Sequence, residues 1–486
     1  MKKFLSIMLC LVMVLTSASV MAEEFGEEEN FSFDIYDSFT VSSADEIMLM
    51  EIDEDVKAAL EERLIAAWEN MDEEVQLYPD IQIHKNDIVA YFSDIFFENP
   101  KYYYVVRSFS GTTNSAGYMG KLTKLSYTVE SMDEVKETWA EIDKATEEIL
   151  LYISPDMTDF EKIMTVHDYM DLHYVYDIND MDQTYLIMLD RVGVCAAYAE
   201  AFQHMMNILG IESSLVKSEE MGHIWNIVKV DGNWYHVDIT WDDPVPDQFG
   251  VVGHEYMFLS EKAIREMGHT GFDATYFANK PKYDKADGRD DCGSIVTVDG
   301  IMYYIEGNNL IDEEGNIIYE SLDGGDGEWS VSQTSHVPDV VRAGLGEING
   351  VLYFNTDTGI YAYNPKTKET ECVLEKYGIG GLFADKNKLC YSTYDFEAQA
   401  FVKMCEIRIC DVRINGPYFE DGKAVVRLYN DCDVPLWIIS KGEGYKVHKV
   451  DAKSLGTAKF ENGASQTIYI WKNSLEPMFE KFTVSE

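Results

Sequence analysis

The chain has 486 residues, of which 39 are basic and 87 acidic, so its formal net charge is −48 at pH 7. This charge argues against nucleic acid as a partner, because phosphate contacts need clustered lysine and arginine side chains. A solubilising acidic surface is the simplest explanation of the charge, and attraction of cationic substrates is the alternative. The length suggests about three domains.

The first 22 residues have the pattern of a signal peptide. Lys2 and Lys3 precede an apolar run from Phe4 to Leu15, and small residues end at Ala22. We expect cleavage after Ala22 rather than lipidation at Cys10, because no small residue lies just ahead of that cysteine. After residue 22 the sequence has no run of about 20 apolar residues, so it predicts no transmembrane segment. The expected location is extracellular, with non-covalent attachment to the cell surface as an option.

Residues 23–45 are rich in glutamate and predict an acidic, disordered lead-in. Residues 46–154 predict an α+β region with helical periodicity at both ends. The expected elements are helices Glu54–Glu74 and Asn86–Phe97, strands Tyr102–Val106 and Leu122–Val129 with a polar loop between them, and helix Met132–Ile153.

Residues 155–285 hold the pattern that predicts chemistry. Thr158 and Glu161 form a capping box that begins a helix. Cys195 opens an amphipathic run that ends at Gly210, a typical helix C-cap. The positive end of a helix dipole and its free N–H groups favour a thiolate and a nearby oxyanion. A buried structural cysteine is the alternative for Cys195 taken alone.

A hairpin follows, with Asp231-Gly232 as a two-residue type I′ turn signal between two alternating segments. This turn pairs Val230 with Asn233, so Trp225 should face Asp238. His223 and Asp238 then become diagonal neighbours on one face, roughly 7 to 8 Å apart at the backbone, within reach of a hydrogen bond between their side chains. A surface ion pair is the alternative for these two residues alone.

Cys195, His223 and Asp238 together supply a nucleophile, a base and a residue that orients the base. The stretches Gly193–Ala199, Gly222–Asn226 and Trp234–Pro244 resemble the core of the transglutaminase-like superfamily. That resemblance implies a papain-related fold and a Cys-His-Asp site that forms an acyl-thioester from a peptide or glutamine amide.

The sequence departs from the family's pattern at two positions. Ala197 stands where many members have glycine, and Ile224 stands where alanine commonly follows the histidine. Both changes bear on substrate fit more than on chemistry. We expect Trp225 and Trp241 to pack the hairpin, with a role as a substrate wall as the alternative, and Tyr198 to support the site.

Other polar groups predict less. His167 and His173 lie six residues apart on one predicted helix and so on different faces, which argues against a metal pair. Asp242 and Asp243 are expected to cap a loop. Residues 323–328 predict a flexible acidic turn rather than a calcium loop, because the ligand spacing is incomplete. We expect no cofactor and no metal.

After residue 285 the pattern changes to short strands. Residues 286–404 predict a β-repeat domain, because Asp299–Tyr304, Asn349–Phe354 and Lys386–Tyr391 share a turn-then-apolar form; three copies are too few to close a propeller. Residues 405–486 predict a β-sandwich of immunoglobulin type. Six cysteines lie in this half of the chain and form either disulfides, in any of 15 pairings, or free thiols. They are Cys292, Cys372, Cys390, Cys405, Cys410 and Cys432.

The predicted fold class is therefore α+β, with a papain-like core and β-rich C-terminal modules. The predicted function is cysteine-dependent acyl transfer on a protein or peptide amide, cell-wall peptide included, with either water or an amine as acceptor. The alternative is a non-catalytic surface-binding protein, favoured by aromatic residues near Tyr303, Tyr353 and Trp437. The sequence leaves open the oligomeric state and whether the N-terminal region covers the site.

Overall fold

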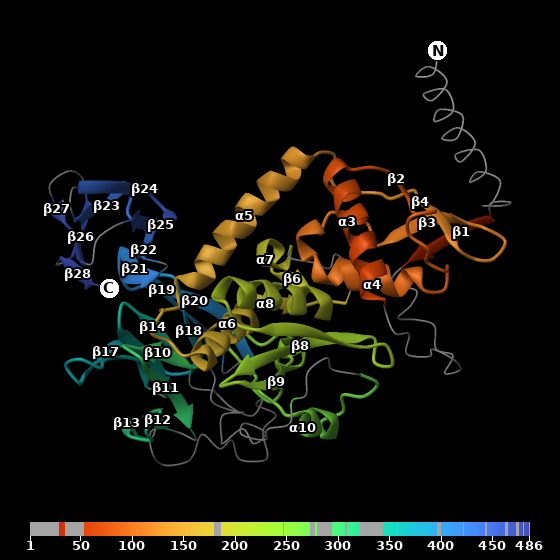
Figure 1. The fold of residues 1–486 in the computed structure, drawn as a ribbon. Helices are drawn as coiled ribbons and strands as arrows, with labels where there is room; N and C mark the ends of the chain where they lie inside the picture. Colours follow the sequence, from red (N-terminus) through yellow and green to blue (C-terminus); the bar gives the residue numbers. More distant parts are fainter. Residues whose placement is uncertain are drawn as a thin grey trace. The chain divides into compact units, whose positions relative to one another are not determined.

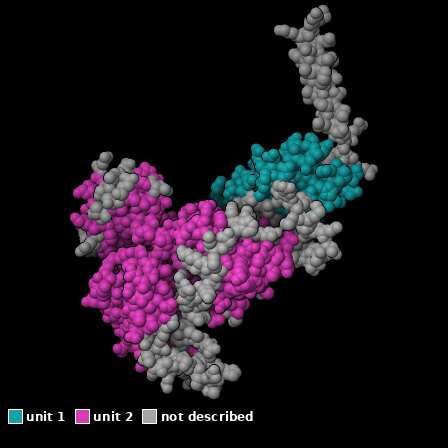
Figure 2. All heavy atoms as spheres, turned by 60° about the horizontal axis from the view of Figure 1, so that its bottom comes forward, with its two compact units in different colours: residues 1–140 teal, residues 141–486 magenta. Residues whose placement is uncertain are grey.

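The structure is a computed structural model, and its two compact units, residues 1–140 and 141–486, are coloured separately in Figure 2. It describes residues 29–34, 53–178, 186–245, 247–272, 278, 294–306, 309–320, 322, 344–356, 358–395, 400–420, 422–442, 445–461, 465–472, 476–479 and 481–485. The expected signal peptide and the acidic turn at residues 323–328 lie outside these ranges.

The first unit packs helices on an antiparallel sheet with strand order β1-β3-β4-β2. Its aromatic centre is Trp68, which is fully buried and lies against the rings of Phe92, Phe96 and Tyr102. The elements are β1 Glu29–Asp34, α3 Glu54–Asn70, β2 Glu74–Gln76, α4 Ile88–Glu98, the 3-10 turn η1 Pro100–Tyr102, β3 Ser108–Thr113, β4 Met119–Thr123 and the start of α5 Met132–Leu150.

Several predictions for this unit are wrong. The predicted strand Leu122–Val129 overlaps β4 only at Leu122 and Thr123. Glu29–Asp34, expected to be disordered, forms a strand paired along its whole length with β3. The segment expected to be a polar loop contains β3, which lies between β1 and β4 in the sheet. Tyr102, expected to begin a strand, is instead the last residue of the 3-10 turn η1. Small side chains suit a strand paired on both sides: a Cβ at Gly111 would lie 2.8 Å from the Lys121 carbonyl. Pairing with two neighbours outweighs the weak strand propensity of this segment.

The second unit begins with the segment that resembles the superfamily core. In Figure 1, α6 and α8 lie side by side above the sheet that contains β8 and β9. Helix α6 starts at the predicted capping box, since the Thr158 hydroxyl and Glu161 side chain bond to each other's backbone N–H. The elements are α6 Asp159–His173, β5 Val175–Tyr176, α7 Ile187–Asp190, β6 Val192–Gly193, α8 Cys195–Leu209, β7 Ser213–Ser218, β8 His223–Val230, β9 Asn233–Val237, α9 Ile239–Asp242 and α10 Glu261–Glu266.

Three small antiparallel sheets follow, each a meander of neighbouring strands. Tyr303 and Tyr353, expected to be exposed, are 4% and 7% exposed because they pack in the cores of these sheets. The sheets are β10 Val296–Val298, β11 Ile301–Glu306, β12 Asn309–Asp312 and β13 Ile317–Tyr319; β14 Leu345–Ile348, β15 Val351–Thr356, β16 Gly359–Asn364 and β17 Glu369–Glu375; and β18 Ile379–Asp385, β19 Lys388–Asp395 and β20 Ala400–Arg408.

The C-terminal part is a sandwich of two antiparallel sheets, β21-β22-β25 and β24-β23-β26-β27, with β28 paired to β26. Alternate apolar side chains of both sheets fill the space between them, as in Val426, Ile438 and Ile470. The strands are β21 Val412–Glu420, β22 Lys423–Asn430, β23 Leu436–Lys441, β24 Tyr445–Val450, β25 Ser454–Glu461, β26 Ser465–Lys472, β27 Glu476–Pro477 and β28 Phe482–Ser485.

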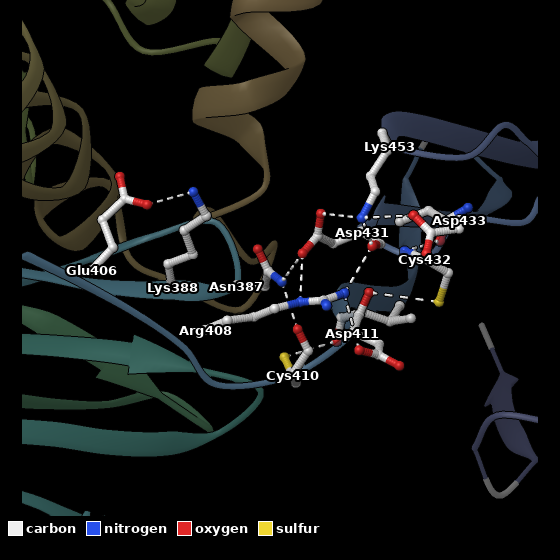
Figure 3. A network of polar contacts seen from close by, with 12 residues as sticks. Asn387, Lys388, Glu406, Arg408, Cys410, Asp411, Asp431, Cys432, Asp433 and Lys453 are labelled. Carbon is white, nitrogen blue, oxygen red and sulfur yellow. Dashed lines mark hydrogen bonds and ion pairs between the residues drawn. The ribbon is translucent and has the colours of Figure 1, made fainter. Parts of the chain in front are cut away.

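A polar network joins the last small sheet to the sandwich (Figure 3). The Arg408 guanidinium bonds to Asp431 at its carbonyl oxygen (2.7 Å) and at Oδ2 (2.6 Å), and Lys453 bonds to the same carbonyl oxygen. Asn387 is fully buried and donates to the Cys410 carbonyl at 2.5 Å and to Asp431 Oδ2 at 3.1 Å. The network therefore centres on Asp431, with Asn387 as its buried member.

Asn387→Ala is expected to lower the free energy of unfolding by about 1–3 kcal/mol, because buried hydrogen-bond partners lose their donor. Lys388→Ala, next along the chain, removes an exposed ion pair with Glu406 and should cost under about 1 kcal/mol. Urea denaturation of the two variants measures the difference. Equal destabilisation by both would contradict a structural role for the network.

Two further observations concern the described residues. None of their helices combines the length and apolarity needed to cross a bilayer. Their cysteines are all free thiols, namely Cys195, Cys372, Cys390, Cys405, Cys410 and Cys432.

Candidate active site

Cys195 is the first residue of α8 and is partly exposed. The N-cap residue, Val194, has no side chain that could bond to the first turn, so the first N–H groups of α8 receive no cap from it. The preceding Gly193 allows a close approach, because a Cβ there would lie 2.8 Å from the Ala197 Cβ. The helix ends at Gly210, which has a positive φ of 70°. Both predicted ends of this helix are confirmed.

The predicted hairpin register is confirmed, with Val230 opposite Asn233 and a turn whose residues Asp231 and Gly232 have φ of 50° and 74°. The expected pairing of Trp225 with Asp238 does not form. Strand β9 ends at Val237, because Asp238 caps the helical turn α9 by accepting the Trp241 N–H at 3.3 Å.

His223 and Asp238 are nonetheless in direct contact, with 2.6 Å between Nε2 and Oδ2. The structure thus brings together all three predicted residues, since Cys195 lies close enough to His223 to contribute to the pKa of its imidazole. Because Nε2 is bonded to Asp238, the other ring nitrogen, Nδ1, is the one left for Cys195.

Electrostatics at this contact favour a protonated imidazole. Burial alone would lower the pKa of His223, but the charge and hydrogen bond of Asp238, with a contribution from Cys195, raise it to about 10. Burial would raise the pKa of Asp238, yet the charge of His223 and the bonds from His223 and His269 lower it. The Asp238 carboxylate is therefore ionised and stabilises a positive charge on His223.

His269 is a residue that the sequence analysis missed. Its Nε2 lies 2.8 Å from Asp238 Oδ2, the same oxygen that His223 contacts. It follows α10 in the chain, 31 residues after Asp238, in a loop without a periodic pattern. No local motif predicts a role for His269. The only signal in the sequence is that a histidine without an assigned role lies within the predicted domain.

The aromatic residues separate into packing and lining roles. Trp225 is 1% exposed, stacks on His223 and donates its indole N–H to His236 Nδ1 at 3.0 Å, so it packs the hairpin as expected. Trp241 is 40% exposed with its ring centroid 5.7 Å from that of His223, which suits a wall beside the site. Tyr198 is buried and donates to Asp243 Oδ2, so it supports α9 from beneath.

A second buried polar cluster lies beside the first. His167, fully buried, places its ring nitrogens 3.0 Å from Asp168 Oδ1 and 3.1 Å from Asp242 Oδ2. His254 Nε2 lies 2.8 Å from Asp168 Oδ1. Asp242 accepts the Tyr256 N–H at 2.9 Å, so it does cap a loop, but its bond to His167 was not foreseen. The cluster ties α6 to α9, the turn that begins at Asp238.

Stability should depend on pH through this cluster. Burial would lower the pKa of His167, but Asp168 and Asp242 raise it from 6.5 to about 9. Burial would raise the pKa of Asp168, but His254 and His167 lower it from 3.8 to about 2. The His167 contribution is thus complete below pH 6.5 and is lost as pH rises through about 9. The Asp168 contribution is complete above pH 3.8 and is lost as pH falls through about 2.

Urea denaturation of the wild type and of His167→Gln between pH 6 and about 9.5 measures the alkaline effect. The stability difference between them should shrink as pH rises. A difference that stays constant over this range would contradict a charged His167.

Two groups of side chains have atoms close enough to hold a metal ion. They are His167, Asp168 and His254, and His223, Asp238 and His269, with ligand atoms within 4.8 Å of one another in each group. In both groups, ring nitrogens of two histidines hydrogen-bond to one shared carboxylate oxygen. These bonds satisfy the carboxylates without an ion.

The comparisons with known proteins agree with this geometry. A family model described as the transglutaminase-like superfamily matches residues 147–239, a range that contains Cys195, His223 and Asp238. The chain therefore carries a domain of the transglutaminase-like superfamily, and its fold class is α+β.

The curated relatives match only part of their length. A human protein named kyphoscoliosis peptidase is 26% identical over 132 residues, which is 22% of this chain and 20% of that protein. Its mouse counterpart is 23% identical over 133 residues, with the same coverage of 22% and 20%. The chain thus matches about a fifth of the length of these relatives. A solved structure titled "Crystal structure of a TGase" is 13% identical over 49% of this chain and 60% of that one, with a TM-score of 0.20.

Proposed function

We propose that this protein is a cysteine-dependent acyl-transfer enzyme that acts on protein or peptide amides through a thioester at Cys195. The observation that carries the proposal is the 2.6 Å contact of His223 with Asp238, together with a Cys195 near enough to that imidazole to raise its pKa. A buried structural cysteine would need neither an imidazole partner nor a carboxylate behind it.

The residues suit the steps of such a reaction. His223 takes the thiol proton, and the Cys195 sulfur attacks the amide carbonyl carbon. The uncapped N–H groups at the start of α8 can donate to the oxyanion that forms. His223 then gives its proton to the leaving amine as the C–N bond breaks, and Asp238 keeps the imidazole oriented. Water or an amine resolves the thioester and restores the thiol.

Hydrolysis is the favoured outcome. Two curated relatives carry the name peptidase, and the sequence has no evident lysine-rich acceptor groove. Incubation with a glutamine-rich protein and labelled cadaverine separates the two outcomes. Release of ammonia or a peptide without incorporated label supports a hydrolase, and label in the protein supports a transferase.

The proposed location is extracellular. The charged start, apolar run and small residues of positions 1–22 support export and cleavage after Ala22. Mass spectrometry of the protein recovered from culture medium tests this, because the mature chain should begin at Glu23.

The first test of the proposed chemistry is the pH dependence of Cys195 alkylation by a small haloacetamide, read by peptide mass spectrometry. We expect fast labelling well below the ordinary thiol pKa of about 8.5, and its loss in His223→Ala. Cys372, which is exposed, is the internal control, because its labelling should not change in His223→Ala. Equal profiles for the two cysteines would overturn the proposal.

A second candidate function is binding to a wall glycan through the sandwich. On one face of the sheet β24-β23-β26, Trp437 lies opposite both Trp471 and Lys449, and the exposed Tyr445 and Val447 extend the patch. These three strands carry four lysines and no acidic residue, in a chain of net charge −48. Co-sedimentation of the full chain with purified cell walls tests this function. Unchanged binding of a Trp437→Ala, Tyr445→Ala variant would count against it.

A further inference from the structure

Asp238 is held from more than one side. Its Oδ2 lies 2.6 Å from His223 Nε2 and 2.8 Å from His269 Nε2, and its Oδ1 accepts the Trp241 N–H at 3.3 Å. His223 comes from β8 and His269 from the loop after α10. Two imidazoles from separate segments therefore converge on one oxygen of a carboxylate that is 1% exposed.

The contacts define which nitrogen of His269 carries hydrogen. A carboxylate oxygen can only accept, so Nε2 must be the donor. Nδ1 is buried and has no hydrogen-bond partner among the described residues. A proton on Nδ1 would bury an unpaired N–H on a charged ring, which is unfavourable. Nε2 of His269 therefore carries the hydrogen that Asp238 accepts.

The surroundings hold this ring in place. Its centroid lies 4.3 Å from that of Trp241 and 4.8 Å from that of Trp225. Two hydrogen bonds hold the loop in place. Ser218 Oγ donates to the Thr270 carbonyl at 2.7 Å, and the backbone N–H of His269 donates to the Ile264 carbonyl at 3.1 Å. His269 thus has little freedom to leave Asp238.

We infer that His269 is a positioning residue for the reaction at Cys195. Its imidazole Nε2–H fixes the Asp238 carboxylate, and the carboxylate in turn orients His223 toward the thiol. This inference rests on the proposed function. A carboxylate with one donor on each oxygen can rotate, whereas a second donor on Oδ2 limits that rotation. The titratable groups against the ring are Asp238, His223 and Tyr256, with His236 close by, and Glu220 accepts a hydrogen bond from the next residue, Thr270.

A pair of variants tests the role of the N–H. His269→Gln keeps an amide donor near the position of Nε2, and His269→Leu removes it. In the haloacetamide assay, His269→Leu should label Cys195 about tenfold or more slowly at neutral pH, since a hydrogen bond to a charged group is lost. Its labelling profile should also move toward that of an ordinary thiol, while His269→Gln stays within about threefold of the wild type.

His236→Leu is the matched control. His236 is as buried as His269, but its Nδ1 accepts the Trp225 indole N–H, whereas His269 contacts Asp238. It should lower stability without changing the pH profile of labelling. A wild-type profile in His269→Leu, or the same slowing in His236→Leu, would overturn the inference.

A measurement on the wild type covers the case in which His269→Leu fails to fold. Imidazole ¹⁵N chemical shifts should show His269 with a hydrogen on Nε2. Protonation on Nδ1 with a bare Nε2 would overturn the inference, because no hydrogen would then be available for Asp238. This readout is separate from the proposed function, which fails instead if Cys195 labels as an ordinary thiol in both the wild type and His223→Ala.

Discussion

Asp238→Asn is expected to slow Cys195 alkylation at neutral pH by about 100-fold or more, as loss of the orienting carboxylate does in related catalytic arrangements. An asparagine side chain has one oxygen, which cannot face both imidazoles and the Trp241 N–H at once. The charge that raises the pKa of His223 is also removed. The measurement is the second-order rate of labelling from pH 5 to 9.

Asp231→Asn is the control for this substitution. Asp231 is exposed in the hairpin turn, and Asn-Gly is as favourable as Asp-Gly in a type I′ turn. Its labelling rate should match that of the wild type. A rate for Asp238→Asn within about threefold of the wild type would show that the carboxylate does not act on the thiol through His223.

His167→Leu should lower the free energy of unfolding by about 3–5 kcal/mol, because it leaves a buried carboxylate without its counter-charge. In this variant Asp168 still contacts His254 and accepts the Ile295 N–H, but Asp242 Oδ2 loses its hydrogen bond to His167. Urea denaturation measures the loss. Because Asp242 belongs to the same turn as Asp238, labelling of Cys195 should slow as well.

Adding Asp242→Asn to His167→Leu should recover part of the lost stability. The amide removes the unpaired charge, and its oxygen can still accept the Tyr256 N–H. Lys162→Ala on the same helix removes a contact of 3.9 Å to an exposed Asp159 and should change stability by less than about 1 kcal/mol. A double variant less stable than the single one would contradict a charge-based account of the cluster.

The helix at Cys195 and the hairpin register could be predicted from the sequence because both depend on local signals. Gly210 ends the helix, and Asp231-Gly232 sets a two-residue turn from which every strand pair follows. The contact between His223 and Asp238 still forms, although β9 ends at Val237, three residues before the expected Thr240, and Asp238 caps α9.

What the sequence did not reveal depends on contacts between distant segments. His269 meets Asp238 across 31 residues, and His167 meets Asp242 across 75. No periodicity links such pairs. The central position of β3 was missed for the same reason, since its partner β1 lies in an acidic stretch whose composition suggested disorder. Local patterns thus located the nucleophile and its base, but not the buried residues around them.

Val194 shows how stability and reactivity can oppose each other in one residue. A serine or aspartate at this N-cap position would add about 1 kcal/mol to the helix by bonding to its first N–H groups. The same bond would compete for these donors with the oxyanion of the proposed reaction at Cys195. An engineer who improves helix caps throughout this protein should therefore leave residue 194 alone, because a more stable helix there would oppose the proposed chemistry.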